Sequence, residues 1–185
     1  MTHCRMASNG FAALLLAALM LQGCAGSGER VEAGPARAIP PASTSVVFSN
    51  LDGIHAQIAR HRGRPLLLNF WATWCVPCVE ELPDLALLAE EYGEEGPAFV
   101  GISFDAWVTG GGDETETKVR DALATAGATY ANLIYEGDQD PILSAFDLPG
   151  PIPYSILYDR DGQTDFIWGG AIDIDRFRQA VAELP

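Results

Sequence analysis

The sequence predicts an α/β fold in which a mixed central β-sheet is flanked by helices on both faces. Short apolar runs typical of buried strands alternate with longer segments of helical periodicity. The last two strand-like runs are separated only by the turn sequence at residues 159–162, which is typical of an antiparallel hairpin. The chain has 185 residues, 48% of them hydrophobic, which is enough for one domain with a sizeable core.

The predicted elements follow one another in a regular order. A short helix is expected at residues 54–59, and the continuous apolar run at 66–70 predicts a strand buried on both faces. A turn and a helix with leucines at helical spacing follow, at residues 71–74 and 75–92. The later elements are a strand at 98–103, a helix at 115–126, a strand at 130–135, a short helix at 140–146, strands at 154–158 and 164–168, and a last helix that Asp173 caps and that runs to residue 184. The terminal hairpin makes the sheet mixed rather than purely parallel.

Residues 1–23 have the pattern of an export signal rather than of a folded domain. An apolar run at residues 11–21 follows Arg5 and is too short to span a bilayer comfortably. It ends in Leu21-Gln22-Gly23-Cys24, which resembles a bacterial lipobox. The resemblance implies cleavage before Cys24 and attachment of lipid to its sulfur. An ordinary cleaved signal peptide and an uncleaved anchor are the alternatives.

Residues 24–45 are expected to be a flexible linker, and residues 46–185 are expected to form the folded domain. The linker is rich in Ala, Gly, Pro and Ser, and its prolines break helices and strands. Such a segment would hold the domain away from a membrane. Together with the signal, it predicts a periplasm-facing lipoprotein of the bacterial cell envelope, on either the inner or the outer membrane.

Composition and cysteine spacing exclude several classes of protein. The formal net charge is −14, whereas nucleic-acid binding needs basic surfaces that neutralise phosphates. Two of the four cysteines, Cys4 and Cys24, belong to the export segment, so a four-cysteine zinc site cannot be built and no metal site is predicted. Val79 follows Cys78 where a haem-attachment motif needs histidine, which excludes covalent haem at this position.

Cys75 and Cys78 are the predicted reactive pair. A strand-to-helix turn places Cys75 at a helix N-terminus, where unpaired N–H groups and the helix dipole favour a thiolate. Cys78 lies three residues further on the same face and can attack a mixed disulfide formed by Cys75. Pro77 suits the first helical turn because it lacks an N–H. The alternative is a static disulfide, which would stabilise the protein little because it closes so short a loop.

The segment from Phe70 to Pro83, FWATWCVPCVEELP, resembles the active-site segment of the TlpA/ResA-like thioredoxin family. These are membrane-tethered, extracytoplasmic thiol–disulfide oxidoreductases, often reductants that serve cytochrome c maturation. The resemblance implies a thioredoxin-like fold, protein disulfides as substrates and a membrane thiol–disulfide electron donor. No cofactor is expected.

The resemblance also implies roles for single residues. Glu81 matches the acidic residue that this family places one turn after the second cysteine, where it can exchange a proton with Cys78. Asn69 occupies the place of the buried aspartate of cytoplasmic thioredoxins. The family's cis-proline falls at Pro153, beside the cysteine pair. The residues expected to contact substrate are Trp74, Pro77, Ile152 and Pro153.

Other functions stay open from the sequence. An oxidant or isomerase would use the same cysteines to introduce or rearrange disulfides. A non-catalytic thioredoxin-like binding lipoprotein would use the fold as a scaffold only. A thiol peroxidase would need a distinctive peroxide-binding cysteine site, which the segment from Trp74 to Cys78 does not resemble.

Overall fold

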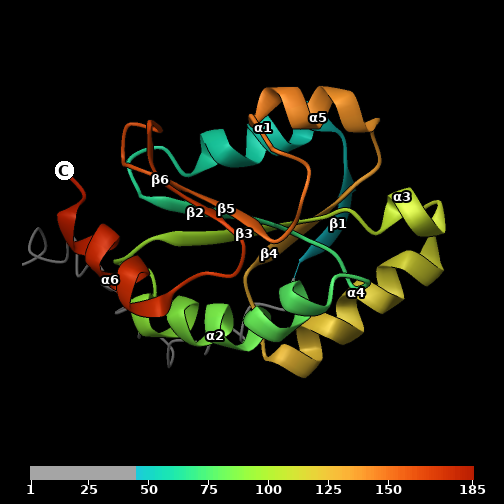
Figure 1. Cartoon of the computed structure of the whole chain (residues 1–185), viewed down its shortest axis with the longest axis horizontal. Coiled ribbons are helices and arrows are strands. Elements are labelled where there is room, and N and C mark those ends of the chain that lie inside the picture. The colour runs from blue at the N-terminus through green and yellow to red at the C-terminus, as the bar shows by residue number, and fades with distance from the viewer. Residues whose placement is uncertain (1–44) are drawn as a thin grey trace, which may run out of the picture. The chain divides into compact units, whose positions relative to one another are not determined.

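A six-stranded mixed sheet forms the centre of the computed structural model, which describes residues 45–185 (Figure 1). The strand order is β1-β4-β3-β2-β5-β6. The first four strands in this order are mutually parallel, whereas β5 is antiparallel to β2 and β6 is antiparallel to β5. The strands are β1 (Val46–Ser49), β2 (Leu66–Trp71), β3 (Ala98–Ser103), β4 (Ala131–Tyr135), β5 (Tyr154–Tyr158) and β6 (Thr164–Gly169).

Helices cover both faces of this sheet, which confirms the predicted fold class. In Figure 1, α1 and α5 lie over one face, and α2, α4 and α6 lie over the other. The helices are α1 (Leu51–Arg60), α2 (Val76–Tyr92), α3 (Ala106–Thr109), α4 (Asp113–Ala126), α5 (Gln139–Ala145) and α6 (Ile174–Glu183). Every residue of β2 and β3 is buried, because these strands lie in the middle of the sheet with helices on both sides.

A buried polar contact joins the central strands beside the core. The indole Nε1 of Trp71 donates a hydrogen bond of 3.0 Å to Oδ1 of Asn132, and both residues are fully buried. Gly101 lies directly against this pair, since a Cβ there would lie 1.9 Å from Asn132 Oδ1. Glycine therefore lets β3 pass between the two side chains.

The structure contains two elements that the sequence did not predict. Strand β1 was missed because it lies at the sheet edge, where only Val46 is buried and no alternating pattern is visible. Helix α3 has four residues, too few to show helical periodicity. Helix α1 begins before the predicted residue 54, because the Asn50 side chain accepts a hydrogen bond of 2.9 Å from the Gly53 amide and caps it. The predicted cap at Asp173 is confirmed.

Residues 1–44 lie outside the described part of the chain. The predicted signal segment at 1–23, the lipidation site Cys24 and all but the last residue of the predicted linker fall among them. Within residues 45–185, no helix is both long enough and apolar enough to cross a membrane.

Candidate active site

Cys75 is the N-cap residue of α2 and is joined to Cys78 by a disulfide bond. The chain leaves β2 at Trp71 and turns sharply, with the Cys75 amide donating to the Ala72 carbonyl at 3.2 Å. Pro77 lies in the first helical turn, and no side chain caps this helix. The free N–H groups of the first turn are therefore available to a negative charge at Cys75.

The two cysteines differ in exposure. Cys75 is 7% exposed, whereas Cys78 is fully buried beneath it. Next to Cys75, Trp74 is 48% exposed and Val76 is 67% exposed, and Pro77 is also exposed. Cys75 thus keeps a small exposed surface beside exposed apolar side chains, whereas Cys78 has none.

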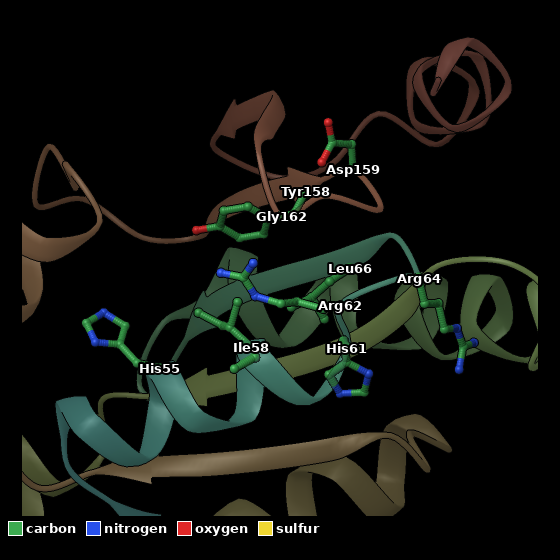
Figure 2. A pocket seen from close by; sticks show the side chains of 10 residues that line it. His55, Ile58, His61, Arg62, Arg64, Leu66, Tyr158, Asp159 and Gly162 are labelled. Carbon is green, nitrogen blue, oxygen red and sulfur yellow. The ribbon is translucent and has the colours of Figure 1, made fainter.

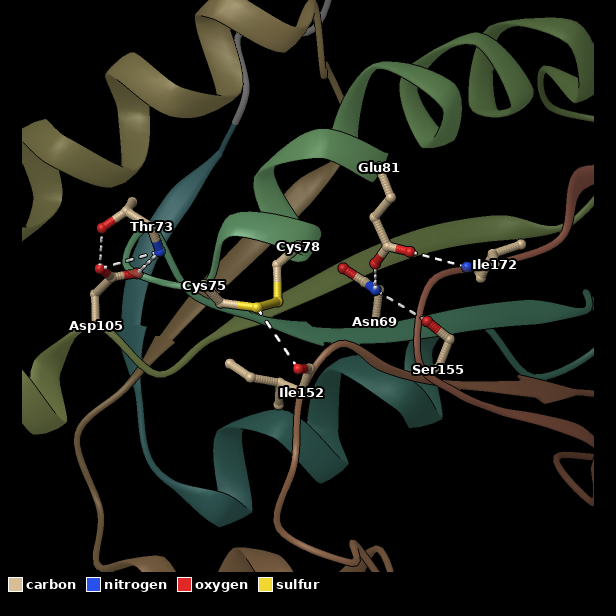
Figure 3. The surroundings of a disulfide bond; sticks show 9 residues. All are labelled: Asn69, Thr73, Cys75, Cys78, Glu81, Asp105, Ile152, Ser155 and Ile172. Atoms are coloured by element: carbon tan, nitrogen blue, oxygen red, sulfur yellow. Dashed lines mark hydrogen bonds between the residues drawn. A yellow bond between two sulfur atoms is a disulfide. The ribbon is translucent and has the colours of Figure 1, made fainter.

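The Ile152–Pro153 peptide bond is cis, as the resemblance implied, and the segment lies beside the reactive pair. Sγ of Cys75 is 3.6 Å from the carbonyl oxygen of Ile152 (Figure 3). In the disulfide this sulfur carries no proton, so the approach is a contact; the reduced thiol could donate a hydrogen bond there. Ile152 is half-buried and Pro153 is buried. The structure thus places Ile152 against Cys75, and Pro153 is the next residue in the chain.

Glu81 is 6% exposed and points from α2 into the space above the sheet (Figure 3). Its Oε1 accepts a hydrogen bond of 2.9 Å from Asn69 Nδ2, and its Oε2 accepts one of 3.0 Å from the Ile172 amide. Asn69 Nδ2 also donates to Ser155 Oγ at 2.9 Å. Burial raises the pKa of Glu81, since it disfavours the charged form more than the two hydrogen bonds favour it. Glu81 is therefore a buried acid, one turn after Cys78, whose proton is held more tightly than usual.

The structure adds one residue that sequence reasoning missed. Asp105 follows the end of β3, is fully buried, and accepts hydrogen bonds from the backbone and side chain of Thr73, two residues before Cys75 (Figure 3). One signal in the sequence could have indicated it. An acid two residues after a buried parallel strand lies at the carboxyl edge of the sheet, where functional groups gather in open α/β folds.

A cavity of about 230 Å³ lies elsewhere, between α1 and the turn that joins β5 to β6 (Figure 2). Its walls include Leu66, the first residue of β2, whereas Cys75 follows the last residue of that strand. In Figure 2 the Arg62 guanidinium points toward Tyr158, while the Arg64 side chain points away and binds the carbonyls of Gly93, Gly96 and Pro97. The cavity is therefore not part of the cysteine site.

Known proteins resemble this chain in both sequence and structure. The Redoxin family matches residues 36–176. Thiol-disulfide oxidoreductase ResA of Geobacillus thermodenitrificans is 28% identical over 147 residues, which cover 80% of this chain and 78% of that protein. The crystal structure of a thioredoxin-family thiol:disulfide interchange protein from Chlorobium tepidum is 26% identical, with a TM-score of 0.55, and covers 68% of this chain and 83% of that chain.

A second crystal structure is that of a secreted Mycobacterium tuberculosis disulfide oxidoreductase, described as homologous to Escherichia coli DsbE. It is 25% identical, has a TM-score of 0.52 and covers 68% of this chain and 86% of that chain. The family match spans well over half of the present chain and includes Cys75 and Cys78. The chain therefore belongs to the Redoxin family and is a thiol–disulfide oxidoreductase, similar to ResA, with a thioredoxin-like fold.

Proposed function

We propose that this protein reduces protein disulfides in the bacterial cell envelope and that Cys75 and Cys78 carry the two electrons. The observation that carries the proposal is the asymmetry of the pair. Cys75 is 7% exposed at the N-terminus of α2, whereas Cys78 is 0% exposed. Disulfide exchange needs one sulfur that meets the target and a second that only its partner can reach.

The reaction begins with both cysteines reduced. The Cys75 thiolate attacks one sulfur of the target disulfide, so that a mixed disulfide forms and the second target sulfur leaves and takes a proton. Cys78 then loses its proton and attacks the sulfur of Cys75, and the first target sulfur leaves. The target gains two electrons and two protons, and the pair ends as the disulfide present in this structure. A membrane thiol–disulfide protein would return the pair to the reduced form.

The position of Cys75 supports its role as the attacking sulfur. The uncapped N–H groups of the first turn of α2 face the N-terminus, and a negative charge there gains about 0.3–1 kcal/mol from the helix. This favours the thiolate, which is the nucleophile. Glu80 lies nearby but is exposed, so water screens its charge.

Glu81 is proposed to exchange a proton with Cys78 when that thiol attacks. It follows Cys78 by three residues, on the same face of α2, and burial raises its pKa. A carboxylate with a raised pKa is a stronger base toward a thiol than an exposed one. Both of its oxygens are held by Asn69 and Ile172, which fixes the carboxyl group in place.

The surface around Cys75 is proposed to hold the target chain. Trp74 and Pro77 expose apolar surface close to Cys75 in the chain, and the carbonyl oxygen of Ile152 lies 3.6 Å from the sulfur. A target chain that contacts these residues would bring its disulfide to Cys75. Apocytochrome c, which family resemblance suggests, is the first target class to test.

The proposed location rests on the N-terminal sequence. Residues 1–23 would be cleaved, lipid would be attached to Cys24, and residues 24–45 would link that anchor to the folded domain at 46–185. The secreted relative from Mycobacterium tuberculosis supports an extracytoplasmic location. Metabolic labelling with a fatty acid should label the parent chain and not the Cys24→Ala variant. An unlabelled parent would contradict the lipid anchor.

Trapping tests the proposed function directly. In cells that express the full chain, Cys78→Ser should accumulate mixed disulfides between Cys75 and its targets, because the releasing step is lost. Cys75→Ser is the matched control and should trap none. Targets whose disulfides persist in cells lacking the protein would support a reductant. Targets that instead lose disulfides in those cells would show that the protein acts as an oxidant or isomerase.

A further inference from the structure

Asp105 is a buried carboxylate that is held only by neutral hydrogen-bond donors. It is 0% exposed. Its Oδ2 accepts from Ser103 Oγ at 2.7 Å and from the Thr73 amide at 3.0 Å, and its Oδ1 accepts from the Thr73 hydroxyl. Among the ion pairs found within residues 45–185, none includes Asp105.

Burying a carboxylate in this way is an energetically unfavourable means of stabilising a loop. A buried carboxylate without a counter-ion loses hydration, and its hydrogen bonds recover only part of this loss. An apolar residue of similar size would fill the space without that loss. The donors that hold the carboxylate indicate what it stabilises.

The Asp105–Thr73 contact continues the connection between two strands after their backbone pairing ends. In the parallel pair β2–β3, Trp71 lies opposite Ser103, and the Phe104 amide donates to the Trp71 carbonyl at 2.9 Å. Beyond this point the β2 chain turns toward Cys75 and the β3 chain enters α3. Asp105 itself is fixed at the start of α3, where its carbonyl accepts from the Thr109 amide at 3.0 Å.

The link holds the turn that carries the accessible cysteine. Thr73 is bound to Asp105 through both its amide and its hydroxyl, and it lies two residues before Cys75 (Figure 3). In the oxidised protein the disulfide also holds Cys75 in place. After reduction that bond is gone, and the turn is held by the Thr73–Asp105 link and the hydrogen bond from Cys75 to Ala72.

We propose that Asp105 is a positioning residue for thiol–disulfide exchange, acting through Thr73 to keep reduced Cys75 at the N-terminus of α2. This rests on the proposed role of Cys75 as the attacking sulfur. A small misplacement of a reacting atom can slow a reaction by large factors, so a loosened turn slows the attack even when the fold survives.

Four variants separate positioning from stability. Thr73→Val removes the hydroxyl at nearly constant size, and Thr73→Ser keeps a hydroxyl. Asp105→Asn removes the charge at constant size, and Asp121→Asn is the matched control, because it removes the charge of an exposed acid on α4. Each is made in the full chain with Cys4 and Cys24 changed to serine, so that Cys75 and Cys78 are the only thiols.

Two rates are measured on the reduced proteins, and urea unfolding is measured on the oxidised ones. The first rate is alkylation of Cys75 by iodoacetamide as a function of pH, and the second is reduction of glutathione disulfide. Thr73→Val and Asp105→Asn should each slow both reactions about tenfold, the effect of losing one hydrogen bond to a charged group. Thr73→Ser and the Asp121→Asn control should stay within about twofold of the parent.

Two further readouts are specific to positioning. In Thr73→Val the pH midpoint of alkylation should move upward, because the thiolate loses its alignment with the helix N–H groups. The double variant Thr73→Val/Asp105→Asn should be slower than either single variant by less than the product of the two effects, since both changes weaken the same link.

The proposal is overturned if Thr73→Val and Asp105→Asn keep the parental rates and pH midpoint and show only a lower urea midpoint. Asp105 would then be a structural residue. The Cys75→Ser variant distinguishes failure of the positioning role of Asp105 from failure of the proposed function. A Cys75→Ser chain that still reduces glutathione disulfide at the parental rate would refute the role of Cys75 itself. An inactive Cys75→Ser chain beside a fully active Asp105→Asn chain would refute only the positioning role.

Discussion

Replacing Glu81 should change the stability of the oxidised protein by an amount that the hydrogen bonds predict. In Glu81→Ala, Asn69 keeps its bond to Ser155, but the buried amide of Ile172 loses its partner. An unsatisfied buried donor costs about 1–3 kcal/mol, and the one lost methylene costs about 0.8 kcal/mol. Glu81→Gln keeps the methylenes and an oxygen for Ile172. The alanine variant should therefore be less stable than the glutamine variant by about 2–4 kcal/mol.

The same carboxyl group predicts that the free energy of unfolding of the oxidised protein depends on pH. Burial raises the pKa of Glu81 in the folded protein above the ordinary 4.5, so the folded protein binds this proton more tightly than the unfolded chain does. The contribution of Glu81 to the free energy of unfolding is then largest below pH 4.5 and falls as pH rises toward the folded pKa. Because glutamine does not titrate, the parent should lose stability relative to Glu81→Gln across that window.

Urea unfolding of the oxidised parent and both variants, at a series of pH values from about 4 to 8, measures both effects. Taking the difference between parent and glutamine variant cancels the titration of all other groups. The reasoning fails if the parent gains stability relative to Glu81→Gln as pH rises. It also fails if the alanine and glutamine variants are equally stable.

Three further predictions concern the fold. Trp71→Phe should lower the free energy of urea unfolding by about 2–4 kcal/mol, because it leaves a cavity and an unpaired Asn132 oxygen; a loss below about 1 kcal/mol would contradict this. Gly101→Ala should lower the melting temperature clearly, since the new Cβ would lie 1.9 Å from Asn132 Oδ1, and parental melting would show that the strands can part without penalty. Asn50→Ala should cost about 1 kcal/mol in the same urea assay through loss of the α1 cap, while Asn50→Asp should retain most of the stability.

The central strands and the cysteine pair could be predicted because their signals are local. Strands β2 and β3 are continuous apolar runs, since both of their faces are covered. The pair itself follows from the spacing of Cys75 and Cys78 at a strand-to-helix turn. The cis bond before Pro153 could be expected only from family resemblance, because the sequence offers neighbouring prolines with the same local chemistry.

The rest depends on contacts between residues far apart in the chain. Strand β1 is defined by its pairing with β4, and its own four residues carry no strand pattern. The partners that hold Glu81 include the Ile172 amide, 91 residues later. Asp105 lies 32 residues after Thr73, and only the parallel pairing of β2 with β3 brings them together. Spacing in the sequence does not reveal such contacts.

The equilibrium reduction potential of the Cys75–Cys78 pair tests the central claim most directly. It would be measured against defined thiol buffers in the full chain with Cys4 and Cys24 changed to serine. A reductant should have a potential near that of thioredoxin, roughly −270 mV. A value near that of DsbA, roughly −120 mV, would contradict the proposed direction and identify the protein as an oxidant or isomerase.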